Sequence, residues 1–223
     1  LELRTRLIRI LICLGILSVA GIPFASEIYA FIASPLLDIL PAGSSMIATQ
    51  VTSPFMAPLK LVLFSALLLT MPYLFYELWM FISPGLYKNE KSFVAPLMIS
   101  TIFLFSAGVA FAYLVVLPII FTFFIGVAPE SIQVMTDINQ YLSFVIKLIF
   151  AFGIAFEIPV ATFLLIRTGI VKKESLIKAR PYLIILFFVI GMLLTPPDIF
   201  SQLFLAIPMW LLFEVGLVVS KKN

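Results

Sequence analysis

Six apolar stretches dominate this sequence and restrict what it can fold into. A helix needs about 20 mostly apolar residues to cross the hydrocarbon core of a bilayer. With 63% hydrophobic and 11% charged residues, the chain has too little polar surface to cover a water-soluble globule. We therefore predict one all-α integral membrane domain over residues 1–223. Its six transmembrane helices are expected at 7–25, 59–82, 93–116, 139–166, 182–194 and 199–219.

The fifth predicted span, 182–194, is short. At about 1.5 Å rise per residue it reaches about 20 Å, whereas the hydrocarbon core measures about 30 Å. The sequence Thr195-Pro-Pro-Asp198 follows it, and two adjacent prolines cannot continue a helix because both lack the backbone donor. We therefore expect a tight reversal into the sixth span rather than one long kinked helix.

The distribution of basic residues predicts the orientation. All Lys and Arg residues except Lys60 and Lys147 fall in segments on one side of the predicted spans. Short cytoplasmic loops are enriched in Lys and Arg, so this side is predicted to be cytoplasmic, with both termini inside. The chain begins at Leu1 rather than Met, so we expect residues to precede it. The first span is expected to be a retained helix and not a cleaved signal.

The segments predicted to face outward have a different character. Residues 27–58 carry no Lys or Arg and are rich in Pro, and apolar residues recur at helical spacing from Ile28 to Leu40. We expect a surface helix there that lies along the membrane. Residues 118–127 are expected to extend the third span outward. Asp137, with Gln140 three residues later, is predicted to cap the fourth helix.

The chemistry absent from the sequence excludes several classes of function. There is no His and only one Cys, Cys13, so neither a zinc site of Cys and His nor a Ser-His-Asp or Cys-His catalytic site can be built. No phosphate-binding loop motif is present. The basic residues form no face with interleaved aromatics, which argues against nucleic acid. We predict no catalytic residues, no metal, no cofactor and no enzymatic activity.

Glu157 is the most informative single residue. It lies ten residues before Arg167, which places it about 15 Å from the cytoplasmic end of its helix, near the middle of the bilayer. Acidic side chains at that depth are costly and usually functional. Lys147 is a further ten residues away and cannot pair with it directly. Pro159 should kink the helix, and Glu157 is expected to face a wet cavity or a passing substrate; a protonated carboxyl bonded to another helix is the alternative.

Two acids on the cytoplasmic side, Glu2 and Glu90, stand among basic residues. A ligand that presents two guanidinium groups would need such carboxylates, because Arg pairs with them bidentately. The alternative is ordinary ion pairing, Glu2 with Arg6 at i,i+4 and Glu90 with a nearby lysine, and spacing alone favours it. Aromatic residues that end the second span, Tyr73, Tyr76, Trp79 and Phe81, are mostly expected to anchor it at the interface.

Four segments together resemble one known family, the TatC proteins of twin-arginine protein translocases. They match in order over essentially the whole chain. They are Leu1-Glu-Leu-Arg-Thr-Arg-Leu7, Phe81-Ile-Ser-Pro-Gly-Leu-Tyr-Lys-Asn-Glu90, Ala151-Phe-Gly-Ile-Ala-Phe-Glu-Ile-Pro159 and Gly191-Met-Leu-Leu-Thr-Pro-Pro-Asp-Ile-Phe-Ser-Gln202. The family usually has a His a few residues before the position of Glu2, which lies ahead of this chain.

The resemblance implies a six-helix, curved, glove-like bundle in the bacterial inner membrane, with the last two helices short. It implies binding of twin-arginine signal peptides of folded cargo at the cytoplasmic face, homo-oligomeric receptor complexes, and assembly with TatA and TatB for export driven by the proton gradient. Residues matching the peptide site are Glu2, Arg4, Phe81, Leu86, Tyr87, Lys88 and Glu90, and Glu157 matches a position on the concave side. Met192, Thr195 and Gln202 match a patch that contacts TatA and TatB, and Pro35 and Asp198 match outward functional positions.

Two rival functions follow from the residues alone. A proton-coupled transporter of small molecules could use Glu157, and it would take up substrate without partner subunits. An intramembrane enzyme would need a pair of polar residues deep in facing helices, and we expect only Glu157 at such a depth.

Overall fold

The described part of the chain is helical. The structure, a computed structural model, describes residues 2–37, 39, 46–82, 94–127, 135–194 and 199–220. Within these ranges the only extended pairing is an isolated bridge between Ile47 and Asp137. Five helical stretches are long and apolar enough to cross a membrane: Glu2–Leu37, Ser53–Ile82, Val94–Val127, Ile138–Arg167 and Ile199–Val219. A shorter apolar helix is Arg180–Leu194. The predicted all-α membrane class is confirmed.

The chain divides into two compact units. The first comprises Leu1–Ile102 and Phe121–Ser143, and the second comprises Phe103–Ile120 and Phe144–Asn223. Each unit is built from helices that pack on neighbours in the same unit.

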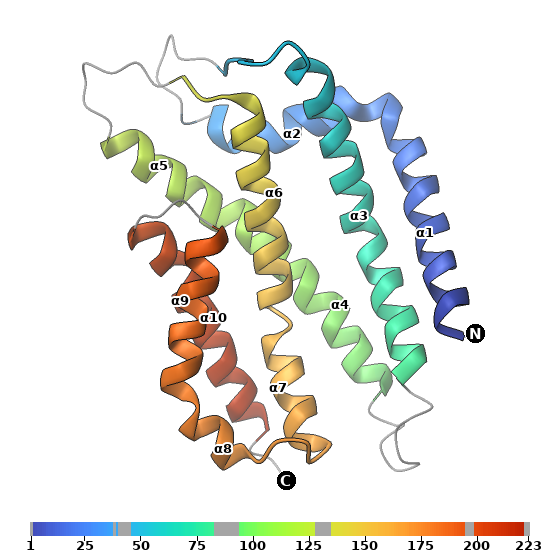
Figure 1. The fold of residues 1–223 in the computed structure, drawn as a ribbon, viewed down its shortest axis with the longest axis vertical. Coiled ribbons are helices and arrows are strands. Elements are labelled where there is room, and N and C mark those ends of the chain that lie inside the picture. The colour runs from blue at the N-terminus through green and yellow to red at the C-terminus, as the bar shows by residue number, and fades with distance from the viewer. Residues whose placement is uncertain are drawn as a thin grey trace. The chain divides into compact units, whose positions relative to one another are not determined.

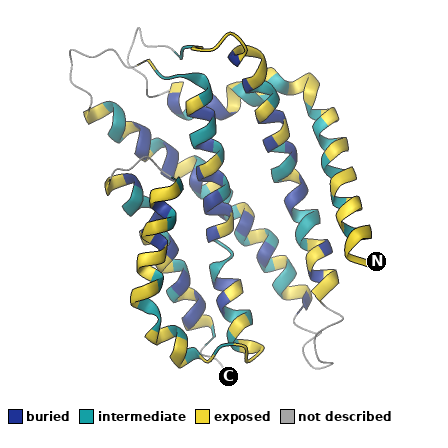
Figure 2. Ribbon diagram, viewed as in Figure 1, coloured by how far each residue is buried: buried dark blue, intermediate teal, exposed yellow. Residues whose placement is uncertain are grey.

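In the first unit, α1 (Glu2–Gly21), the 3₁₀ turn η1 (Ile22–Phe24) and α2 (Ala25–Leu37) pack against α3 (Ser53–Ile82). Arg6 near the start of α1 reaches Glu77 near the end of α3, and Gly21 at the end of α1 lies against Val62, so the two helices run antiparallel. No residue of α1 is buried, and its apolar side chains are left for lipid or a partner (Figure 2).

The helix bounds in this unit differ from the predicted ones. The predicted span 7–25 corresponds to a helix that begins at Glu2 and turns at η1, and the predicted span 59–82 begins at Ser53. Hydropathy locates the apolar centre of a helix, whereas the backbone ladder continues through polar residues at its ends. The segment expected to hold a surface helix contains α2, with Ile32, Ala33 and Leu36 buried and Pro35 inside the helix, and its position along the membrane stays a prediction.

The third helical stretch is continuous over 34 residues, as α4 (Val94–Phe111), η4 (Ala112–Val116) and α5 (Leu117–Val127). The segment η4 is one turn of π-helix, in which Leu117 N–H donates to the carbonyl of Ala112. Pro118 has no N–H for the carbonyl four residues earlier, and the wider π turn allows the helix to continue past it. The expected outward extension over 118–127 is thus helical.

The fourth stretch is interrupted where Pro159 was predicted to kink it. The helix α6 (Ile138–Ala155) ends, Phe156 and Glu157 form a turn, and α7 (Ile158–Arg167) resumes. Pro159 cannot donate to the carbonyl of Ala155, so the ladder breaks at this point. The kink is confirmed, and it places Glu157 immediately before α7.

The second unit is completed by α8 (Lys173–Lys178), α9 (Arg180–Leu194) and α10 (Ile199–Val219), with α10 packed on both α7 and α9 (Figure 1). Gly216 allows α10 to approach α7 closely, because a Cβ there would lie 2.9 Å from Thr162 Cβ and 3.0 Å from Pro159 Cα. The helix α9 has 15 residues, or about 22 Å of rise, and is short, as expected. The resemblance implied that the last helix is short as well, but α10 has 21 residues and is long enough to cross a membrane. The predicted reversal at 195–198 lies outside the described residues.

Candidate functional site

A buried carboxylate joins the start of α1 to the end of α3. Arg6 Nη1 lies 2.6 Å from Glu77 Oε2, and Arg9 Nη1 lies 3.7 Å from Oε1 of the same carboxylate. Tyr73, one helical turn before Glu77, donates its hydroxyl proton to Oε1 at 2.9 Å. Glu77 is 3% exposed, its two oxygens accept hydrogen bonds from Arg6 and Tyr73, and Arg9 adds an ion pair.

The local sequence explains why these groups meet. Arg6 and Arg9 stand three residues apart on α1, and Tyr73 and Glu77 stand four apart on α3, so each pair occupies one helical face. Glu77 lies five residues before the end of α3, about 7.5 Å along the axis, which long arginine side chains can reach from the interface. Glu77 was not among the site residues predicted from the sequence. The signal was an acid inside the apolar run 59–82, opposite a cluster of arginines.

This cluster argues against the alternative that spacing favoured, an ion pair between Glu2 and Arg6. The Arg6 guanidinium is bound to Glu77, and its Nη2 also approaches the carbonyl of Met80 at 3.4 Å. Glu2 is the first residue of α1 and is exposed, as is Arg4, and within the described ranges no ion pair involves Glu2. The helix packing, rather than the i,i+4 spacing, decides which carboxylate takes Arg6.

Of the other predicted peptide-site residues, the structure describes one. Phe81, next to the last residue of α3, is 42% exposed. It lies at the same end of α3 as Met80, which Arg6 contacts, so the start of α1 and Phe81 belong to one end of the first unit. Leu86, Tyr87, Lys88 and Glu90 lie outside the described residues, and their roles stay predictions.

Two of the aromatic residues expected to anchor α3 at the interface have internal partners instead. Tyr73 bonds to Glu77, and the buried Trp79 donates its indole N–H to Thr101 Oγ1 at 3.3 Å. Tyr76 and Phe81 are exposed. Hydropathy cannot distinguish an aromatic residue at the membrane interface from one with a partner inside the protein, because a Trp or Tyr near a helix end suits either place.

A polar cluster closes the opposite end of the first unit. Asp137 Oδ1 accepts the backbone N–H groups of Asn139 and Gln140, each at 3.0 Å, which confirms the predicted helix cap. Asp137 Oδ2 accepts from the hydroxyl of Thr49 at 2.6 Å and from its N–H at 3.1 Å. These bonds, the Thr49 hydroxyl first, hold the pKa of Asp137 below its ordinary value.

The same cluster ties three helices together. Asn139 on α6 bonds to Ser53 at the start of α3, and Tyr141 donates its buried hydroxyl to the carbonyl of Ile32 on α2 at 2.9 Å. The residues 46–53 are thereby attached to the start of α6.

Glu157 is half-buried in the turn between α6 and α7. Its neighbour Phe156 packs on Phe111, with ring centroids 5.6 Å apart, and Gly108 leaves room for Phe156 because a Cβ there would approach it to 2.9 Å. Glu157 thus lies at a break between two helices, next to a close contact with α4. Lys147, on the preceding helix α6, is exposed.

The remaining predicted positions are partly described. Met192, near the end of α9, is 51% exposed, and Gln202 in the first turn of α10 is half-buried beside Gly191. Pro35 is half-buried in α2. Thr195 and Asp198 lie outside the described residues.

Within the ranges that are described, no group of three or more His, Cys, Asp or Glu side chains could hold a metal ion.

Comparison with known proteins gives a consistent result. The family model described as "Sec-independent protein translocase protein (TatC)" matches residues 1–208. A protein of that name from Azotobacter chroococcum is 56% identical over 96% of this chain and 84% of its own length. The corresponding Escherichia coli K12 protein is 50% identical over 99% of this chain and 86% of its own length. A crystal structure titled "Twin Arginine Translocase Receptor- TatC" superposes with a TM-score of 0.88 at 36% identity, covering 99% of this chain and 96% of that one.

Proposed function

This chain belongs to the TatC family of Sec-independent protein translocase proteins, and we propose that it binds twin-arginine signal peptides of folded cargo at its cytoplasmic face. It is a multi-pass protein of the bacterial inner membrane. In the proposal, Glu2 and Glu90 receive the two arginines of the peptide, and Arg4, Phe81, Leu86, Tyr87 and Lys88 line the surrounding surface.

One observation carries the proposal: Glu77 binds the arginines of the chain itself. Because Arg6 and Arg9 are both directed to this buried carboxylate, Arg6 does not neutralise Glu2 at i,i+4. Glu2 therefore stands exposed at the tip of α1, at the end of the first unit where Phe81 is also exposed. An exposed acid beside apolar surface suits a segment that carries both arginine and apolar side chains.

The chemistry favours arginine over lysine at such a site. A guanidinium presents a planar fork of donors that matches the two oxygens of a carboxylate, whereas an ammonium is a compact charge that is more strongly hydrated. Two carboxylates would each bind one of two successive arginines. Replacing both arginines by lysine would lose the bidentate geometry while keeping the charge.

We further propose assembly with TatA and TatB, a homo-oligomeric receptor complex and export driven by the proton gradient. Met192 and Gln202 support this assignment, because Gly191 at the end of α9 lies against Gln202 at the start of α10 and the Met192 side chain next to it is exposed. Thr195 would complete that surface. Glu157 would face the apolar part of the inserted peptide, with Pro35 and Asp198 acting on the outward side.

Co-purification with a twin-arginine peptide and its double-lysine variant tests the receptor role. We expect recovery of the twin-arginine peptide alone, and loss of recovery in Glu2→Lys and Glu90→Lys. Glu174→Lys is the matched control, since it reverses an exposed acid on the same predicted side and should leave capture unchanged. Equal recovery of both peptides, or equal loss in all three variants, would contradict specific arginine recognition.

A further inference from the structure

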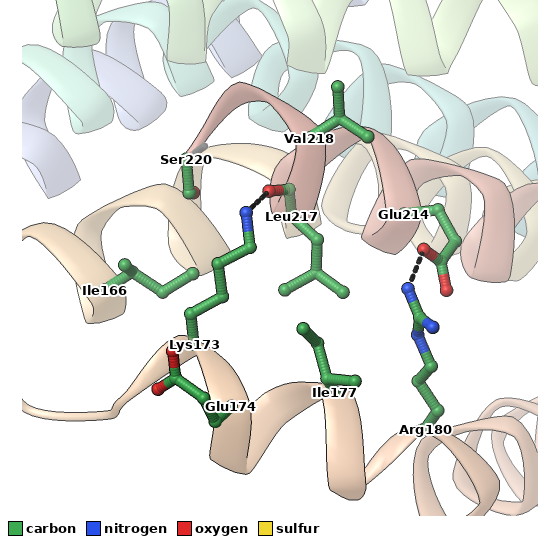
Figure 3. A pocket seen from close by; sticks show the side chains of 9 residues that line it. All are labelled: Ile166, Lys173, Glu174, Ile177, Arg180, Glu214, Leu217, Val218 and Ser220. Carbon is green, nitrogen blue, oxygen red and sulfur yellow. Dashed lines mark hydrogen bonds and ion pairs between the residues drawn. The ribbon is translucent and has the colours of Figure 1, made fainter. Parts of the chain in front are cut away.

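A pocket of about 500 Å³ opens at one end of the second unit, and none of its lining residues belongs to the proposed peptide site. Its lining comes from the end of α7, from α8, from the start of α9 and from the last turns of α10 (Figure 3). This volume is typical of small-molecule sites. Because it lies where three apolar helices begin or end, a molecule in it would sit at the boundary between lipid and water.

The polar part of the lining combines cations with carboxylates. Lys173 Nζ donates to the carbonyl of Leu217 at 2.6 Å, which uses one of its three protons. Arg180 Nη2 donates to Glu214 Oε2 at 2.6 Å. Glu174 is exposed, and no ion pair within the described ranges involves it. Two cations and two carboxylates give this lining a formal charge of zero.

The apolar part of the lining continues toward the outer surface of the helices. Ile177, 39% exposed, lies across from Leu217 in Figure 3, and Val218 on α10 is 66% exposed. A ligand with a charged head could therefore keep its apolar part outside the pocket, against lipid-facing side chains. That is the arrangement expected of a phospholipid whose headgroup enters between helix ends.

We propose that this pocket binds the headgroup of an aminophospholipid of the phosphatidylethanolamine type. The Lys173 ammonium contacts the phosphate, and the Glu174 carboxylate accepts the N–H groups of the lipid amine. A purely anionic headgroup suits the pocket less well, because Glu174 and Glu214 would repel it. A choline headgroup also suits it less well, because a quaternary ammonium has no N–H to donate.

The test uses the purified full chain in bilayer nanodiscs that contain equal amounts of phosphatidylethanolamine, phosphatidylglycerol and phosphatidylcholine. Native mass spectrometry after release measures which lipids stay bound. We expect phosphatidylethanolamine to be enriched over both others. Retention of phosphatidylethanolamine should fall about tenfold in Lys173→Gln, because the substitution removes one charge-assisted hydrogen bond to the phosphate. Glu174→Gln should remove the preference for ethanolamine over choline.

Lys178→Gln is the matched control, because it removes the same charge from α8 at a residue that does not line the pocket. It should leave retention unchanged, and Lys173→Arg should restore part of it. Equal loss in Lys178→Gln and Lys173→Gln would overturn the proposal in favour of diffuse surface charge. Preferential retention of phosphatidylglycerol would overturn the assignment of the headgroup.

A final arm separates a lipid from a free phosphate compound. Free phosphoethanolamine or inorganic phosphate, added to the nanodiscs in excess, should leave the bound lipid in place because neither carries acyl chains. Displacement of the lipid by either compound would show that the pocket serves a soluble ligand and would overturn the proposal. A thermal unfolding scan of each variant confirms that the pocket variants remain folded.

Discussion

Arg6 and Glu77 are separated by 71 residues in the sequence, yet Arg6 Nη1 and Glu77 Oε2 lie 2.6 Å apart. This ion pair holds the start of α1 against the end of α3. The helix α1 buries none of its residues but packs along α3, and the ion pair lies at the end of that contact nearest Glu2.

Glu77→Gln should destabilise the first unit. The substitution leaves the partly buried Arg6 guanidinium without its counter-charge, which costs more than the loss of an exposed ion pair. We expect the melting temperature in detergent to fall by about 5 °C. Arg4→Gln, which removes an exposed charge from the same helix, should leave it unchanged. A fall of equal size in Arg4→Gln would show that the ion pair is not the cause.

The same substitution should weaken peptide capture without altering the proposed peptide site. Once released from Glu77, the Arg6 side chain is free to pair with Glu2 at i,i+4 and to compete with an incoming arginine. Binding of a twin-arginine peptide, measured by fluorescence anisotropy, should weaken several-fold in Glu77→Gln. Removing the competitor in the double variant Arg6→Gln with Glu77→Gln should restore binding. If the double variant binds as weakly as the single one, competition by Arg6 is excluded.

Acid should release the residues attached to Asp137. Its native pKa lies below the ordinary value, so its ionised form contributes stability above the pKa of the unfolded chain, about 3.9. That contribution is lost as the pH falls through the lowered native pKa. The N–H groups of Ile47 and Ile138 donate to the carbonyls of Thr136 and Ile47, beside Asp137. Their amide exchange, corrected for intrinsic rate, should therefore stay slow from neutral pH down to about pH 4 and accelerate below it.

Asp137→Ala provides the comparison for this pH dependence. It should exchange fast at Ile47 and Ile138 at every pH, because both the cap of α6 and the bonds to Thr49 are gone. A pH profile that is identical in the variant and the unchanged protein would show that another group controls the opening of these amides.

Two glycines should respond oppositely to alanine. A methyl group at Gly216 would press on Thr162 and on the backbone at Pro159, so Gly216→Ala should cost about 1–3 kcal/mol of unfolding free energy. Gly15 on α1 has nothing within 4 Å of its Cβ position, and Gly15→Ala should stabilise its helix by about 0.5–1 kcal/mol. Chemical unfolding of both variants measures the difference, and equal effects would contradict the close approach of α7 and α10.

The sequence alone was enough to predict features that depend on a few neighbouring residues. Apolar runs located the helices that can cross a bilayer, Pro159 located the break before α7, and Asp137 with Gln140 located a helix start. Each is decided within about one helical turn, by hydropathy, by a missing N–H or by a cap. Helix ends were less well predicted, because hydropathy falls off before the backbone ladder stops.

The tertiary structure alone decided which side chains meet. Glu2 had a suitable partner in Arg6 by spacing, but α1 packs on α3 and the buried Glu77 takes that arginine. Trp79 on α3 likewise bonds to Thr101 on α4, 22 residues away in the sequence. The pocket at Lys173 and Glu174 exists because the end of α10 lies beside α8. In a membrane most helix surfaces are equally apolar, so hydropathy does not encode the choice of neighbour. That choice depends on close packing and on hydrogen bonds between residues far apart in the chain.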